Sequence, residues 1–278
     1  MTLRERIGVD LGGRRRLEDG LAWAAANGVH YVDMCLEGAP DHPNPNAPAT
    51  WTAAREAALR ATCERHRIHL GLHSASAVNV AETSPLLADA AEQYLETYID
   101  LGGRLGAEWI VVHGGYHFTG DYAARRAAGI ERLQRAAALA ERAGARLLLE
   151  NLNREPEHAE IRYLAHNLEE CREYFGRIQS PSLGWAFTVN HAHLVPEGID
   201  GFLDAMDLGR CGEVRVADSH GHRAILPTTA SRRATGARCP RRPSEGRACS
   251  RARRCARGAT RASTSPARAT ATSAWAWR

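Results

Sequence analysis

The sequence predicts an α/β protein whose fold is a (β/α)8 barrel that lacks its last β/α unit. Residues 1–221 contain seven short apolar runs, and a longer segment with helical periodicity follows each of the first six. Most of the runs are continuously apolar, which is typical of parallel strands covered on both faces. An open, doubly wound sheet is the alternative. We disfavour it because no Gly-x-Gly-x-x-Gly sequence follows the first run, where a dinucleotide-binding sheet would carry one.

The expected elements follow one another regularly along this region. We expect strands at residues 7–12, 30–36, 68–74, 109–114, 146–152, 183–190 and 213–218. We expect helices at residues 14–27, 52–67, 85–105, 121–143, 167–178 and 197–208, which are rich in Ala, Leu, Glu and Arg. Gly28 and Gly144 follow two of these helices, and Pro85 opens another after Ser84, as helix boundaries commonly do.

The composition changes after residue 221, so we predict a barrel domain of residues 1–221 and a basic, irregular tail of residues 222–278. The tail holds 14 arginines and a single acid, Glu245, and shows no apolar period. The barrel domain holds 22 basic and 31 acidic residues, a net charge of −9.

We interpret the tail as the product of a shifted reading frame, because a shifted frame of GC-rich coding sequence yields Arg, Ala, Pro, Ser and Thr. Read in a shifted frame, the codons of residues 226–236 can spell x-Asp-His-Arg-Leu-Pro-Pro-Gly-Asp-Gly, where x is unspecified. A genuine basic arm for acidic partners is the other interpretation. Without an eighth strand, the first and seventh strands would be unpaired edges.

Composition disfavours several classes of protein. No apolar run approaches the roughly 20 residues of a membrane span, and the charged start does not resemble a signal peptide. Seven cysteines without a Cys-x-x-Cys pair indicate neither a disulfide framework nor a thiolate zinc site, so we expect a reduced, cytoplasmic protein. The negative barrel domain disfavours nucleic acid as a partner, because a phosphate backbone requires a basic surface.

Polar side chains stand at the ends of five successive predicted strands. Because the carboxyl ends of parallel strands share one face of a barrel, we expect these side chains to line a common pocket. Glu150 follows three leucines, where a charge has little structural use, and we expect it to be a metal ligand or a proton-transfer base. Imidazole and carboxylate ligands suit Zn, Mn, Co or Mg. The candidates are His73, His113, Glu150, Asn151, Asn190, His191, His193, Arg215 and Asp218.

Three segments resemble the xylose-isomerase-like TIM-barrel superfamily over residues 1 to about 221. They are Val-Val-His-Gly-Gly at residues 111–115, Leu-Leu-Leu-Glu-Asn at residues 147–151 and Asn-His-Ala-His at residues 190–193. That superfamily includes sugar phosphate isomerases and epimerases, inosose dehydratase-like enzymes, keto-sugar lyases and endonuclease IV of AP endonuclease family 2.

The resemblance implies a divalent metal bound through Glu, Asp, His and Glu from strands five to eight. Glu150 matches the first ligand, but Thr188 stands at the Asp position and Arg215 at the His position, and the fourth ligand belongs to the missing unit. The resulting expectation is a metal held by Glu150 and His191, with three of the four usual ligands replaced or missing. Arg215 is expected to bind the carboxylate or phosphate of an acidic sugar.

We hypothesise a sugar isomerase, epimerase or lyase that moves a proton next to a carbonyl, with Glu150 and His191 as catalytic residues. The remaining candidates would bind a small sugar or sugar-acid substrate, and we leave a homo-oligomer open. An endonuclease IV-like nuclease, resting on His73, His113, Glu150 and His191, is the second hypothesis. The third is an inactive, truncated barrel.

Overall fold

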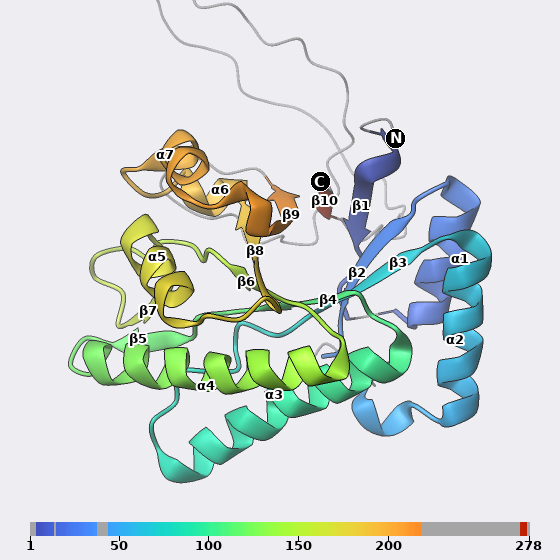
Figure 1. Ribbon diagram of the computed structural model, residues 1–278, viewed down its shortest axis with the longest axis horizontal. Coiled ribbons are helices and arrows are strands. Elements are labelled where there is room, and N and C mark those ends of the chain that lie inside the picture. The colour runs from blue at the N-terminus through green and yellow to red at the C-terminus, as the bar shows by residue number, and fades with distance from the viewer. Residues whose placement is uncertain (1–3, 14, 38–43, 218–272, 277–278) are drawn as a thin grey trace, which may run out of the picture. The chain divides into compact units, whose positions relative to one another are not determined.

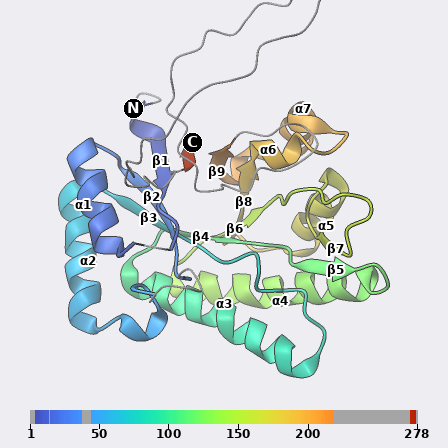
Figure 2. The ribbon, with the colours of Figure 1, turned by 180° about the vertical axis from the view of Figure 1, so that it is seen from behind.

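The computed structural model describes residues 4–13, 15–37, 44–217 and 273–276 of the 278-residue chain, all within one compact unit. Its sheet contains the seven predicted strands as neighbouring parallel strands (Figures 1 and 2). They are β1 (Ile7–Asp10), β2 (Tyr31–Cys35), β3 (His69–His73), β4 (Trp109–Val112), β6 (Leu147–Glu150), β8 (Leu183–Thr188) and β9 (Cys211–Val216). The predicted α/β barrel without its last unit is confirmed.

Each of the six predicted helices is present. They are α1 (Leu17–Asn27), α2 (Ala53–His66), α3 (Pro85–Leu105), α4 (Tyr122–Ala143), α5 (Leu168–Arg177) and α7 (Gly198–Ala205). Local chemistry defines several of their ends: the side chains of Thr52 and Asn167 cap α2 and α5, and Gly28 ends α1 at a φ of 66°. No helix in the described parts of the chain has the length and apolar character needed to cross a membrane.

Several short elements were not predicted from the sequence. β5 (Tyr116–Phe118) and β7 (Ile161–Tyr163) form a separate antiparallel pair beyond the ends of β4 and β6. The others are single turns of helix: α6 (Val189–Ala192), η1 (Arg4–Arg6), η2 (Pro48–Thr50) and η3 (Leu208–Arg210). Strands of three residues and single helical turns are too short to show a hydrophobic period.

A further strand, β10 (Ser273–Ala276), lies between β1 and β9 and closes the ring of strand pairings. It is antiparallel to both neighbours, whereas the eighth strand of a (β/α)8 barrel is parallel to them. The expectation that β1 and β9 are unpaired edges is therefore wrong. The rest of the predicted tail, residues 218–272 and 277–278, lies outside the described residues, and its frameshift origin stays a prediction.

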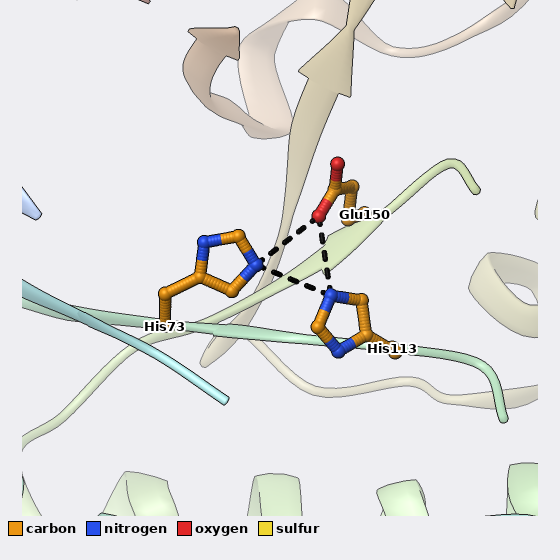
Figure 3. Close-up of side chains that lie close together, drawn as sticks. All are labelled: His73, His113 and Glu150. Atoms are coloured by element: carbon orange, nitrogen blue, oxygen red, sulfur yellow. Dashed lines mark hydrogen bonds and ion pairs between the residues drawn. The ribbon is translucent and has the colours of Figure 1, made fainter. Parts of the chain in front are cut away.

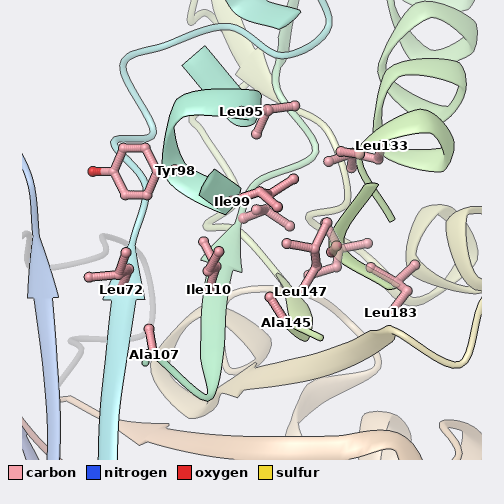
Figure 4. Close-up of a cluster of buried hydrophobic side chains, with 14 of the residues drawn as sticks. Leu72, Leu95, Tyr98, Ile99, Ala107, Ile110, Leu133, Ala145, Leu147 and Leu183 are labelled. Atoms are coloured by element: carbon pink, nitrogen blue, oxygen red, sulfur yellow. The ribbon is translucent and has the colours of Figure 1, made fainter. Parts of the chain in front are cut away.

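Side chains along each strand alternate between the surrounding helices and the barrel interior. On β4, Ile110 and Val112 belong to the large core shared with α3 and α4, which Figure 4 shows around Leu95, Ile99 and Leu133. Trp109 and Val111 belong to a separate cluster with Leu148 and Ala186 inside the barrel. Gly71 makes room for that cluster, since a Cβ there would lie 1.9 Å from the Trp109 indole.

Candidate functional site

Three side chains converge at the ends of β3, β4 and β6 (Figure 3). His113 Nε2 lies 3.2 Å from Glu150 Oε2, His73 Nε2 lies 3.4 Å from the same oxygen, and the two Nε2 atoms are 3.2 Å apart. Glu150 and His113 are buried, and His73 is half-buried. Three of the candidate residues therefore form one compact cluster, whereas the sequence led us to pair Glu150 with His191 as metal ligands.

The strand alternation explains why these side chains meet. Leu148 faces the barrel interior, so Glu150, two residues later, faces it as well. In the same way, His113 lies two residues after Val111 and His73 lies two residues after Gly71, so both side chains face the interior. Burying a carboxylate and two imidazoles without partners would be costly, and their mutual contacts remove much of that cost.

The spacing of the cluster fits a divalent metal ion. A tetrahedral ion with ligand bonds of about 2.1 Å holds its ligand atoms about 3.4 Å from one another. The three donor atoms of His73, His113 and Glu150 are separated by 3.2, 3.2 and 3.4 Å. Two imidazole nitrogens and one carboxylate oxygen are a donor set that zinc, cobalt and manganese accept.

Each imidazole of the cluster also has a partner on its other nitrogen. His73 Nδ1 lies 3.4 Å from Asp33 Oδ2, and His113 Nδ1 lies 3.3 Å from Ser74 Oγ. Partners of this kind fix the ring orientation of metal-binding histidines and leave Nε2 for the ion. We did not single out Asp33 from the sequence. Its position two residues after Tyr31, on the inward side of β2, is the signal that could have found it.

Glu150 carries a full negative charge in this environment. Burial by itself would raise the pKa of Glu150, but hydrogen bonds from His113 and His73 outweigh burial and hold the pKa well below its ordinary value. Thr188 Oγ1 donates a hydrogen bond of 2.5 Å to Oε1, the oxygen that faces away from the two imidazoles. Thr188 therefore orients the glutamate.

His191 lies beside the cluster as a neutral imidazole. Burial lowers the pKa of His191. Its Nδ1 lies 2.8 Å from the backbone oxygen of Asn151, which can only accept, and 3.5 Å from Glu150 Oε1. Nδ1 therefore carries the proton, and Nε2 keeps a lone pair that can accept another.

Asn151 fixes the neighbouring strand ends. Its amide donates to the backbone oxygen of Thr188 at 3.0 Å, and its Oδ1 accepts from the Thr188 backbone N–H at 2.8 Å. These two hydrogen bonds join the end of β6, which carries Glu150, to the end of β8, which leads into the helical turn that carries His191. Asn151 therefore acts on the site through the backbone.

Arg215 has acidic partners within its own chain. Its Nη1 lies 2.7 Å from Asp33 Oδ2 and 2.6 Å from Glu213 Oε1, and its Nη2 lies 2.8 Å from Asp10 Oδ2. The side chain is buried. Because three carboxylates already surround the guanidinium, the expectation that Arg215 binds an anionic substrate does not agree with this geometry.

The remaining candidates lie apart from this contact network or outside the described residues. Asn190 is buried, and its Oδ1 has no hydrogen-bond partner within the part of the chain that the structure describes. His193 is exposed to solvent. Asp218 lies outside the described residues.

Comparison with solved structures yields several sugar epimerases. A D-tagatose 3-epimerase-like protein shares 17% identity at a TM-score of 0.64, with 77% of each chain covered. The D-psicose 3-epimerase of Clostridium cellulolyticum, solved with D-tagatose, shares 14% at 0.61, covering 74% of this chain and 71% of the other. An L-ribulose 3-epimerase shares 13% at 0.57, covering 74% and 69%. At these identities the likeness shows the fold alone.

Among curated proteins, none matches the chain by sequence. The family model described as a xylose isomerase-like TIM barrel matches residues 21–236, which is more than half of the chain. This match agrees with the resemblance carried by the segments around His113, Glu150 and His191. The chain belongs to the xylose isomerase-like TIM-barrel family.

Proposed function

We propose that this protein is a sugar isomerase or epimerase that moves a proton at a carbon next to the carbonyl of a keto-sugar. We further propose that a divalent ion held by His73, His113 and Glu150 assists it. The observation that carries the proposal is the convergence of three ligand atoms within 3.4 Å of one another at the carboxyl ends of β3, β4 and β6. The structural similarity to D-tagatose, D-psicose and L-ribulose 3-epimerase chains supports the sugar class.

In this proposal Glu150 would bind the metal ion, and another side chain would carry the proton. A divalent ion at the cluster supplies polarisation of the substrate's carbonyl or hydroxyl oxygen. The Glu150 carboxylate stays ionised, and Thr188 holds its second oxygen in place. That negative charge favours the approach of cationic and hydroxyl groups and stabilises a positive charge that develops on a neighbouring imidazole.

His191 would be the proton carrier. With Nδ1 bonded to the backbone oxygen of Asn151, His191 Nε2 is free to take the proton from the carbon next to the carbonyl. The electron pair of that C–H bond moves into the neighbouring carbon–carbon bond, and the carbonyl oxygen gains the negative charge. Solvent water that gives a proton to the same carbon from the opposite face yields an epimer, and the hydroxide left behind takes up the proton held by His191. Return of the His191 proton to the adjacent carbon yields an isomer when the proton of the neighbouring hydroxyl passes to the former carbonyl oxygen.

An endonuclease IV-like activity is a second candidate, because the same His73, His113 and Glu150 cluster could bind a metal that acts on a phosphodiester. The charge of residues 1–221 opposes it. With 22 basic and 31 acidic residues, this region would repel a DNA backbone.

One experiment distinguishes the two activities. The full chain, supplied in turn with Mn, Co, Mg and Zn, is incubated in D₂O with a panel of ketoses that includes D-tagatose, D-psicose and L-ribulose. NMR then detects deuterium at the carbon next to the carbonyl. We expect incorporation with at least one ketose and no nicking of abasic DNA. Nicking without any deuterium incorporation would support the nuclease instead.

A further inference from the structure

A cavity of about 540 Å³ is lined by none of the candidate residues of the proposed site. Its volume is within the range of small-molecule binding sites, about 300–1,000 Å³. Its walls come from the β5 and β7 pair, the loop between β6 and β7, the start of α4, the start of α5 and the loop after α6.

The chain connects this cavity directly to the proposed site. Four residues beyond His113 is His117, four beyond Glu150 is Arg154, and four beyond His191 is Val195, and all three line the cavity. Four residues span at most about 14 Å even when fully extended. A ligand whose reacting carbon lies at Glu150 could therefore extend into the cavity.

One wall of the cavity is rigidly built from polar groups. Glu170 is buried, and it accepts hydrogen bonds from Tyr122 Oη at 2.8 Å and from the backbone N–H of His166 at 3.4 Å. His166 Nδ1 lies 3.2 Å from the same carboxylate, and Asn167 Nδ2 bonds its other ring nitrogen at 3.2 Å. His117 Nδ1 lies 2.9 Å from the backbone oxygen of Phe118, and its ring lies edge-on to Tyr122. These side chains are already oriented before any ligand arrives.

The chemistry of the lining favours a neutral ligand that is rich in hydroxyl groups. Five glutamates and two arginines line the cavity, so a phosphate or carboxylate would meet an excess of negative charge. Hydroxyl groups can donate to carboxylates and accept from guanidinium and amide groups at once. Tyr122 and Tyr163 add aromatic surface for the C–H faces of a sugar ring.

We propose that this cavity binds a second, neutral sugar unit, so that the substrate is a glycosylated keto-sugar in preference to a free monosaccharide. The proposal rests on the proposed sugar chemistry at Glu150 and adds the substrate class to it. The side chains that would contact the second unit lie on the cavity rim, where Arg154 and Glu197 are exposed.

The test compares the binding of three probes to the full chain by calorimetry: D-fructose, isomaltulose, which is fructose carrying a glucosyl unit, and fructose 6-phosphate. We expect isomaltulose to bind about tenfold more tightly than fructose, the size of effect that one or two added hydrogen bonds give. The double variant Arg154→Gln and Glu197→Gln should lose this preference. The matched double variant Glu64→Gln and Arg65→Gln, on the exposed surface of α2, should retain it.

Equal binding of fructose and isomaltulose would overturn the proposal, as would a preference that the cavity variants leave unchanged. Tighter binding of fructose 6-phosphate than of isomaltulose would overturn the neutral-ligand class. These outcomes are separate from the proposed reaction. An isomaltulose preference that depends on Arg154 and Glu197, without deuterium exchange in any sugar, would support the cavity assignment and count against the reaction.

Discussion

Asp33 Oδ2 lies 3.4 Å from His73 Nδ1, on the opposite side of the imidazole ring from the nitrogen that contacts Glu150. Asp33 is completely buried on β2, and Arg215 holds the same oxygen at 2.7 Å. Burial and the Arg215 charge would lower the pKa of His73, but the hydrogen bonds to Asp33 and Glu150 raise it to about 10. Asp33 therefore helps to orient the His73 ring and, together with Glu150, favours its charged form.

Replacing this aspartate should weaken metal binding. Asp33→Asn keeps the size of the side chain but removes the charge that orients His73, and losses of about 10- to 100-fold in metal affinity are typical of such partners. The dissociation constants of Zn and Co, measured by competition with a chelating dye, check this expectation. Asp89→Asn, at an exposed position of α3, is the control. An unchanged affinity in a folded Asp33→Asn protein would remove Asp33 from the site.

His191, within α6, and His193, just after it, should contribute unequally to the reaction rate. His191→Asn removes the proposed proton carrier, and we expect deuterium exchange to slow by at least about 100-fold, the scale of a positioned acid–base group. His193→Asn changes an exposed side chain two residues away and should leave the rate within about twofold. Equal rates in the two variants would place the base elsewhere.

Arg215 should prove essential for stability. Arg215→Met removes the guanidinium that the carboxylates of Asp10, Asp33 and Glu213 share, and breaking a buried ion pair in this way costs about 3–5 kcal/mol. Urea unfolding, followed by circular dichroism, measures the loss of unfolding free energy. A stable variant whose only defect is a raised KM would instead restore the substrate-binding role that the sequence led us to expect.

Acid should weaken the contact between α1 and α2. The hydrogen bond from Arg55 lowers the pKa of Glu18 to about 2, so Glu18 stabilises the folded state above its unfolded pKa of about 4.5. That contribution is lost as the pH falls from about 4.5 towards 2. The difference in Tm between the natural protein and Glu18→Gln should therefore be largest at neutral pH and vanish near pH 2. A difference that is constant with pH would contradict the assignment.

The periodicity of the apolar residues and the Gly and Pro residues at helix ends predicted the parallel strands, the six helices and the face of the barrel that carries the polar side chains. The alternation of side chains along β4 and β6 explains why His113 and Glu150 could be placed correctly. The partners of a buried charge are harder to predict, because they depend on which strands become neighbours. Arg215 and Asp33 are 182 residues apart in the chain, and only closure of the barrel brings them together. The β5 and β7 pair escaped prediction because each strand has three residues.

Exchange of solvent deuterium into a ketose by the Glu150→Gln variant tests the central claim most directly. Glu150 contacts both imidazoles of the proposed metal site, and the amide of Gln keeps the shape of the side chain without its charge. We expect the natural protein to incorporate deuterium next to the carbonyl, and Glu150→Gln to lose at least about 100-fold in rate together with its bound metal. The control Glu131→Gln, on the exposed face of α4, should keep both. A Glu150→Gln protein with natural metal content and a natural exchange rate would contradict the account.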